Sequence, residues 1–159
     1  MPAKRLLNGK RILIVDDEPD ILAVLEDLLP MCYITKTSKF NEAKKLLEIK
    51  PFDFAILDIM GVCGFDLLDI AKEKKIDVVM LTAHALSPEN IEKSYLNNAA
   101  SFVPKEKIAD IEIFLNDILE ARKKGESLWW RWLERMEDYC IHKFGPEWQK
   151  QFGVKTNLK

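Results

Sequence analysis

This sequence has few cysteines, no long apolar run and no marked excess of either charge, and each absence excludes a class of protein. The chain of 159 residues holds only Cys32, Cys63 and Cys140, without a CxxC pair or regular spacing, which favours reduced, buried or half-buried thiols over a disulfide framework. No apolar run approaches the ~20 residues that a membrane span requires. Polar residues 8–11 interrupt the N-terminal stretch before a signal-peptide core forms. We therefore expect a soluble, cytoplasmic protein without membrane contact.

The charge balance gives no general affinity for nucleic acids. Lysine and arginine number 24 against 26 aspartates and glutamates, so we expect no binding to DNA. Apolar residues make up 48% and charged residues 31%, a composition that can bury a core and is unlike that of a disordered tail. The length allows one ordinary domain with a short appendage. We expect an N-terminal tail at 1–9, a domain at 10–124 and a helical extension at 125–159.

Five short runs of β-branched and apolar residues alternate with longer segments of helical spacing. This alternation predicts a parallel α/β sheet, with right-handed connections that place helices on both of its faces. Functional sites in such doubly wound sheets form at the carboxyl ends of the strands. The runs begin at residues 12, 33, 54, 78 and 101. The expected helix starts are Pro19, Ser38 as an N-cap, Gly64, Ser87 as an N-cap before Pro88, and Ile108.

Polar residues follow the strands of this expected sheet. Asp16 and Asp17 end the first strand, and Asp58 ends the third. Thr82 ends the fourth strand, and Lys105 follows the fifth. Each residue alone has an ordinary explanation, since an aspartate after a strand often caps a helix. Three carboxylates in one crevice repel one another, however, and must bind protons or hold a cation. Because Mg²⁺ prefers oxygen ligands, we expect it at this edge.

Four ordered segments carry a specific set of motifs: ILIVDDEPD at 12–20, AILDIM at 55–60, VVMLTAH at 78–84 and SFVPK at 101–105. With them, the sequence resembles the response regulator receiver family. The resemblance implies a flavodoxin-like sheet of five parallel strands in the order 2-1-3-4-5, with five helices. It also implies a bacterial two-component system or phosphorelay, in which a sensor histidine kinase or phosphotransfer protein phosphorylates Asp58. Such a protein signals by contact with a downstream protein and is an enzyme only toward its own phosphorylation.

The resemblance implies a role for each acidic residue. Asp17 would bind Mg²⁺ directly, and Asp16 would act largely through water. Asp58 would supply one metal oxygen and the nucleophile, and the backbone carbonyl of Met60 would complete the metal site. Phosphoryl transfer needs positioning and positive charge around the phosphoryl oxygens rather than a strong base, and these assignments meet that need.

The resemblance further implies four residues that respond to the phosphoryl group. Thr82 would hydrogen-bond one phosphoryl oxygen, and Lys105 would pair with another. Phe102 would rotate inward as Thr82 moves, although a plain core aromatic is the alternative interpretation. His84 would affect the lifetime of the phosphoaspartate rather than bind a metal, because one histidine does not make a metal site.

Two features depart from the family pattern. Gly64 follows Asp58 after a shorter loop than in most relatives, which changes the region beside which a kinase would dock. Pro104 precedes Lys105 and Glu106 follows it. The usual lysine-proline order is therefore reversed, which changes the backbone that carries the lysine.

Beyond residue 125 the sequence predicts an amphipathic helix. Its stripe would pack on the receiver domain, form a homodimer or bind a partner protein. The opposite side carries charges of both signs, which does not suit a DNA backbone, and the segment is too short for a helix-turn-helix output domain. Trp130 and Trp148 fall outside the stripe, and we expect them to be exposed as interface aromatics are. The stripe comprises Leu128, Trp129, Trp132, Leu133, Met136, Tyr139 and Cys140.

Two other functions are compatible with the sequence. A constitutive adaptor would use the tryptophan-rich helix and retain the acidic pocket as a vestige. A Mg²⁺ phosphatase with an aspartyl intermediate would usually place a second aspartate two residues after the nucleophile. Met60 occupies that position, so we prefer the phosphorylated signalling protein.

Overall fold

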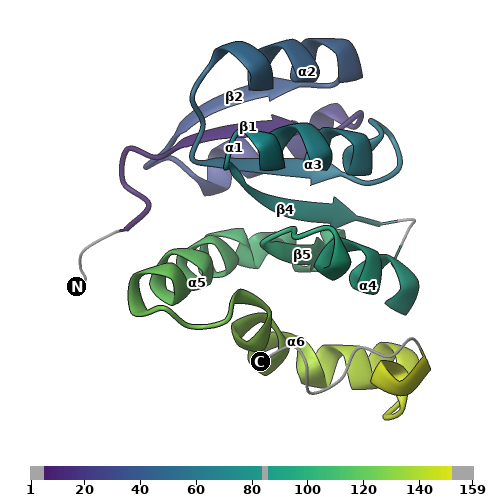
Figure 1. Cartoon of the computed structure of the whole chain (residues 1–159). Helices are drawn as coiled ribbons and strands as arrows, with labels where there is room; N and C mark the ends of the chain where they lie inside the picture. The colour runs from purple at the N-terminus through teal and green to yellow at the C-terminus, as the bar shows by residue number, and fades with distance from the viewer. Residues whose placement is uncertain (1–5, 84–85, 152–159) are drawn as a thin grey trace.

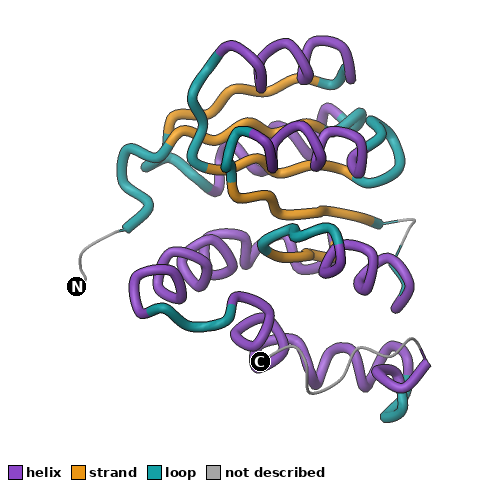
Figure 2. The backbone as a smooth tube through the Cα atoms, viewed as in Figure 1, coloured by secondary structure: helices purple, strands orange, loops and turns teal. Residues whose placement is uncertain are grey.

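The protein folds around one parallel sheet with the strand order β2-β1-β3-β4-β5. The computed structural model describes residues 6–83 and 86–151. Figures 1 and 2 show the sheet running through the molecule between helices. The strand order and parallel direction confirm the predicted fold. The strands are β1 (Arg11–Val15), β2 (Tyr33–Thr37), β3 (Phe54–Asp58), β4 (Asp77–Thr82) and β5 (Ser101–Pro104).

Six α-helices and two short 3₁₀ helices complete the described chain. Helices α1 and α5 contact each other, as do α2 and α3, and the sheet lies between these two pairs (Figure 1). Across 6–83 and 86–151, no helix is both long enough and apolar enough to traverse a lipid bilayer. The helices are α1 (Pro19–Leu28), α2 (Phe40–Ile49), α3 (Gly64–Glu73), α4 (Pro88–Leu96), α5 (Ile111–Lys124) and α6 (Leu128–Phe144), with η1 (Lys105–Asp110) and η2 (Trp148–Gln151) as the 3₁₀ helices.

The starts of α4 and α2 differ in their capping. Ser87 is the N-cap of α4, as predicted, and its Oγ accepts a hydrogen bond from the Asn90 amide at 3.1 Å. The prediction for Ser38 is wrong, because α2 has Lys39 as its N-cap, without a side-chain hydrogen bond. The hydroxyl of Thr37 instead accepts a hydrogen bond from the Lys39 amide at 3.2 Å. This turn at the end of β2 delays the helix.

The fifth helical segment is divided in two. The stretch that begins at Lys105 forms the 3₁₀ helix η1, and the α-helix begins at Ile111 rather than at the predicted Ile108. Lys105 and Glu106 therefore lie on a short, tightly wound segment directly after β5, where 3₁₀ turns commonly connect elements.

The register of the strands aligns their carboxyl ends. Val15 of β1 pairs with Leu57 of β3, so Asp16 and Asp58 each follow that aligned pair by one residue. Thr82 at the end of β4 pairs with Pro104 at the end of β5. All five residues of β3 are buried, as expected for a central parallel strand with helices on both faces.

The C-terminal helix packs on the rest of the same chain. Figure 1 shows α6 at the bottom of the view, beyond α5 and β5. The indole of Trp129 donates a hydrogen bond to the Ala99 carbonyl at 2.7 Å. The indole of Trp132 donates one to the Phe102 carbonyl, also at 2.7 Å. Of the three interpretations of the apolar stripe, packing on the receiver part of the chain is the one that the structure shows.

The expectation that Trp148 is exposed is wrong. Its side chain is only 1% exposed, because η2 folds back and places the ring 6.4 Å from the rings of Trp132 and Phe144. Trp130 is partly buried as well. The short turn after Gly145 brings Trp148 back onto α6. Because Trp148 lies outside α6, the helical spacing of that segment could not predict its burial.

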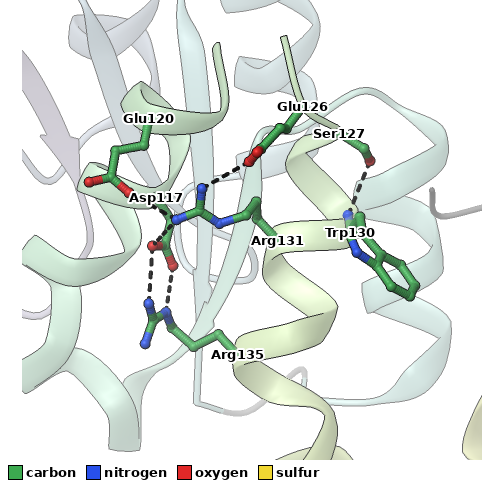
Figure 3. Close-up of polar contacts among 7 residues, drawn as sticks. All are labelled: Asp117, Glu120, Glu126, Ser127, Trp130, Arg131 and Arg135. Carbon is green, nitrogen blue, oxygen red and sulfur yellow. Dashed lines mark hydrogen bonds and ion pairs between the residues drawn. The ribbon is translucent and has the colours of Figure 1, made fainter. Parts of the chain in front are cut away.

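Ion pairs between α5 and α6 hold the two helices together (Figure 3). Asp117 of α5 has a side chain only 12% exposed, and its Oδ1 lies 3.1 Å from Nη2 of both Arg131 and Arg135. Arg131 also contacts Glu120 at 3.0 Å and Glu126 at 3.1 Å. Asp117 is the partner that Arg131 and Arg135 share, so its removal would leave both arginines without this carboxylate. Because the site is nearly buried, water would replace the lost contact poorly.

The three cysteines are free and differ in exposure. Cys32 is half-buried and Cys140 is buried, as predicted. Cys63 is exposed, contrary to the prediction, because it lies on the loop before α3 with a left-handed backbone (φ 56).

Candidate functional site

The carboxyl edge of the sheet forms a pocket that contains most of the predicted site residues. Asp16 is fully buried and contacts the pocket residue Lys105. Because β1, β3, β4 and β5 all end at this edge, residues distant in the sequence meet there. The pocket has a volume of ≈ 320 Å³ and is lined by Asp17, Glu18, Asp58, Met60, Gly61, Thr82 and Lys105.

Lys105 is the cation at the centre of this site. Its Nζ lies 2.9 Å from Asp16 Oδ2, 2.6 Å from Glu18 Oε1 and 3.4 Å from Asp58 Oδ1, and its side chain is 9% exposed. Burial alone would lower the pKa of Lys105, but the carboxylates of Glu18 and Asp16 raise it above its ordinary value. Lys105 is therefore protonated at physiological pH and able to pair with an anion in the pocket.

Asp16 provides the test of whether a cation fits here. Its Oδ1 accepts a hydrogen bond from the Glu18 amide at 2.9 Å. Its buried Oδ2 contacts the Lys105 ammonium at 2.9 Å. Burial raises the pKa of Asp16, although Lys105 opposes that effect. A buried carboxylate oxygen whose only partner among the described residues is the Lys105 ammonium keeps a lone pair available for a metal or for an ordered water bound to one.

Neighbouring carboxylates strengthen this fit. Asp16, Asp17 and Glu18 each place one oxygen within 4.8 Å of the others. Together with Asp58 they put four carboxylates at a pocket that contains one lysine, and three of them contact that lysine, so the site has an excess of negative charge. The oxygen-rich donor set suits a hard divalent ion such as Mg²⁺.

Asp58 is held in a fixed orientation at the end of β3. Its side chain is 6% exposed, and Oδ2 accepts a hydrogen bond from the Gly61 amide at 2.9 Å. The other oxygen, Oδ1, is the one near Lys105. The Met60 side chain is 65% exposed and borders the pocket, where its backbone carbonyl remains a predicted metal ligand.

Two glycines make the short loop after Asp58 possible. A Cβ atom on Gly61 would lie 2.3 Å from Asp17 Cγ, and one on Gly64 would lie 2.3 Å from the Asp58 carbonyl oxygen. Both distances are far below van der Waals contact. The early glycine noted in the sequence therefore allows α3 to begin directly against the backbone of Asp58.

The structure bears differently on the three residues that are predicted to respond to phosphorylation. Thr82 is buried at the end of β4, and it borders the pocket beside Lys105. Phe102 is completely buried in the core, which agrees with its interpretation as a core aromatic, while its rotation remains a prediction. His84 lies outside the described residues.

A second cavity adjoins the first on the side of α6. It has a volume of ≈ 200 Å³, and Thr82 and Lys105 line both cavities. Lys143 of α6 is part of its wall. The full lining is Thr82, Ala83, Leu86, Pro104, Lys105, Glu106 and Lys143.

Sequence reasoning did not include three charged residues around the site. Glu18 directly follows the aspartate pair, so its position next to Asp17 was a usable signal. Glu106 follows Lys105 in the same way. Lys143 had no such signal, because only the docking of α6 brings it to this edge.

A larger cavity of the described residues lies elsewhere and does not offer comparable chemistry. It has a volume of ≈ 560 Å³ and lies beside the first residues of β1 and β2, at the opposite edge of the sheet. None of its lining residues is an aspartate or a glutamate. It consists of Arg11, Tyr33, Ile34, Thr35, Lys50, Pro51 and Phe52.

Comparisons with known proteins agree with the fold. The chain is similar to a receiver domain protein of Methanospirillum hungatei described as CheY-like. The TM-score is 0.65 and the identity 27%, over 74% of this chain and 100% of that one. It is also similar in fold to a BeF₃-activated DrrB receiver domain, with a TM-score of 0.63, 21% identity, and coverage of 70% of this chain and 98% of that one.

Curated relatives and a family model identify the family. The response regulator ARR18 of Arabidopsis thaliana is 35% identical over 61% of this chain, and ARR12 of the same plant is 31% identical over 72%. The matches cover only 16% and 20% of those two proteins. Both relatives are plant proteins, so they do not support the expected bacterial origin. The model of the response regulator receiver domain matches residues 12–114. The chain therefore belongs to the response regulator receiver domain family of two-component systems.

Proposed function

We propose that Asp58 accepts a phosphoryl group from a phosphorylated histidine of a sensor kinase or phosphotransfer protein. One observation carries this proposal. Asp58 is an almost buried carboxylate that faces a pocket with one oxygen fixed by the Gly61 amide and the other 3.4 Å from the Lys105 ammonium. Such an arrangement supplies the positioning and positive charge that phosphoryl transfer requires.

In the proposed reaction, Asp58 Oδ1 attacks phosphorus. The phosphorus–nitrogen bond to the donor histidine breaks, and its electron pair goes to the imidazole nitrogen. Lys105 then pairs with one phosphoryl oxygen, and the hydroxyl of Thr82 donates a hydrogen bond to another. The phosphorylated side chain carries ~1.5 to 2 negative charges, by analogy with other phosphorylated residues, so Lys105 is needed to offset them.

Asp16, Asp17, Asp58 and the Met60 carbonyl would hold Mg²⁺, with Asp16 acting largely through water. The ion would offset the carboxylate charge and stabilise charge on the transferring oxygens. The chain's own residues orient the nucleophile, because Gly61 fixes Oδ2 and Gly64 permits α3 to abut Asp58.

The proposed output is contact with a downstream protein rather than DNA binding or catalysis on a separate substrate. The adaptor alternative assigns the function to the tryptophan-rich helix. Trp129, Trp132 and Trp148 are at most 6% exposed in the structure, whereas Trp130 is partly exposed and lines a cavity on α6. Most of the aromatic surface of the extension is therefore used in packing within the chain, which favours output by the phosphorylated form.

Incubation with acetyl phosphate and Mg²⁺, followed by intact mass spectrometry, tests the proposal. We expect one phosphoryl adduct on the wild-type protein, and none after chelation of Mg²⁺ or in Asp58→Asn. Asp69→Asn, an exposed aspartate on α3, is the matched control and should label normally. Labelling that persists in Asp58→Asn would disprove the assignment.

A further inference from the structure

Two consecutive residues of η1 connect the pocket to the C-terminal helix. Lys105 contacts the acidic residues of the pocket, as described above. Glu106, the next residue, accepts a hydrogen bond from the Tyr139 hydroxyl and lies 3.1 Å from Lys143 Nζ. Both partners belong to α6. Glu106, Tyr139 and Lys143 are called the Glu106 cluster below.

Tyr139 lies at the centre of this contact. Its ring centre is 5.4 Å from Lys107 Nζ of η1 and 5.9 Å from Lys143 Nζ, within the range of cation–π attraction. Tyr139 therefore binds η1 twice, through its hydroxyl to Glu106 and through its ring to Lys107. The same helix binds the β5 region through its two buried indoles.

We infer that the Glu106 cluster couples the docking of α6 to the state of Asp58, so that phosphorylation weakens the packing of α6 against β5 and η1. This inference rests on the proposed function of Asp58. It assigns Glu106 as a positioning residue and α6 as a segment that masks a surface until the pocket is phosphorylated.

The physical reason lies in the competition for Lys105. Its ammonium is now held by Glu18 at 2.6 Å and by Asp16 at 2.9 Å. A phosphoryl group on Asp58 draws Lys105 away from those carboxylates. Because Lys105 begins a 3₁₀ helix of only six residues, a displacement of its backbone also moves Glu106 relative to α6.

The contacts of the Glu106 cluster can break at small cost. Glu106 and Lys143 have side chains 48% and 39% exposed, and exposed ion pairs are individually weak and screened by salt. The cavity between Lys105 and Lys143 leaves room for η1 to move. A small shift of η1 would therefore change the contacts of Glu106 with Tyr139 and Lys143 of α6 directly.

The chain contains two built-in reporters of α6. All four tryptophans lie between residues 129 and 148, so intrinsic fluorescence reports on α6 and η2 without a signal from the pocket. Cys140 of α6 is 1% exposed, and burial raises the pKa of its thiol to about 12. Alkylation of Cys140 is therefore slow while α6 is docked.

The first experiment adds Mg²⁺ and beryllofluoride, which mimics the phosphoryl group, to the full chain. We expect a red shift of tryptophan emission and at least about tenfold faster alkylation of Cys140 at pH 8, read by peptide mass spectrometry, which corresponds to an opening equilibrium shifted by one decade. Cys32, which precedes β2 at the far edge of the sheet, is the internal reference. An unchanged or slower rate at Cys140, with beryllofluoride bound, overturns the inference.

The second experiment uses reciprocity. If phosphorylation weakens the Glu106 cluster, then weakening the cluster must tighten beryllofluoride binding by the same factor. We expect Lys143→Met and Tyr139→Phe to bind beryllofluoride about fivefold more tightly in calorimetry, the lower end of usual coupling. Removing the positive charge of Lys143 would by simple electrostatics weaken anion binding, so the sign of the effect decides between coupling and local charge.

Lys150→Met is the matched control, since Lys150 is an exposed lysine paired with Glu147 at 2.9 Å, away from η1. It should leave the affinity unchanged. Weaker binding in Lys143→Met, or no change in Tyr139→Phe, overturns the coupling. A wild-type protein that binds no beryllofluoride and accepts no phosphoryl group overturns the proposed function as well, whereas binding without a response of α6 overturns only this inference.

Discussion

Replacing Gly61 by alanine would disturb the proposed metal ligand Asp17 while leaving the fold intact. A Cβ atom at this position would lie 2.3 Å from Cγ of Asp17 and 2.4 and 2.5 Å from its two oxygens, whereas ordinary contact begins at 3.4 Å. The carboxylate must therefore move by about 1 Å. Because Asp17 is exposed, its side chain can rotate away without disturbing the core.

The expected consequence is a loss of Mg²⁺ affinity with little loss of stability. Changing a group that orients a metal ligand typically costs about 10- to 100-fold in metal affinity, so we expect Gly61→Ala to bind Mg²⁺ about tenfold to hundredfold more weakly, or about 1.4 to 2.8 kcal/mol. The midpoint of urea unfolding without Mg²⁺ should remain close to that of the wild-type protein.

Calorimetric titration with Mg²⁺ measures this effect. Met60→Ala is the control, because the proposed ligand is its backbone carbonyl and its side chain is 65% exposed. That variant should bind Mg²⁺ as the wild-type protein does. Wild-type affinity in Gly61→Ala would show that Asp17 is not a ligand and would refute the reasoning. A large loss in Met60→Ala would argue against the carbonyl assignment.

Two further substitutions test the packing around the site. Gly64→Ala should destabilise the fold by about 1–3 kcal/mol, since its Cβ would lie 2.3 Å from the backbone oxygen of Asp58, which cannot rotate away; a wild-type urea midpoint would contradict this. Asp117→Asn should cost about 1.5–3 kcal/mol, because its carboxylate is 12% exposed and contacts two arginines of α6. Denaturation followed by tryptophan fluorescence would measure it, and a cost near zero would show that these pairs do not hold α6.

Much of the fold could be predicted from the sequence because its signals are local. A parallel strand buried on both faces reads as a continuous apolar run, as in Phe54–Leu57, and a helix after it reads as a period of 3.6. Asp16, Asp58 and Thr82 could be assigned to one edge because parallel strands all end on the same side. Capping was predictable where the hydroxyl was available, as at Ser87, and not at Ser38, where the neighbouring Thr37 makes the hydrogen bond instead.

Only the tertiary structure decided where α6 packs and what it contacts. An amphipathic stripe shows that one face of a helix will be buried, but several apolar surfaces can cover it equally well. The burial of Trp148 and the pairing of Glu106 with Lys143 depend on that choice, because they join residues that no local pattern relates. The sequence alone therefore determined the sheet and the acidic edge, whereas the connection between that edge and the C-terminal helix came from long-range packing.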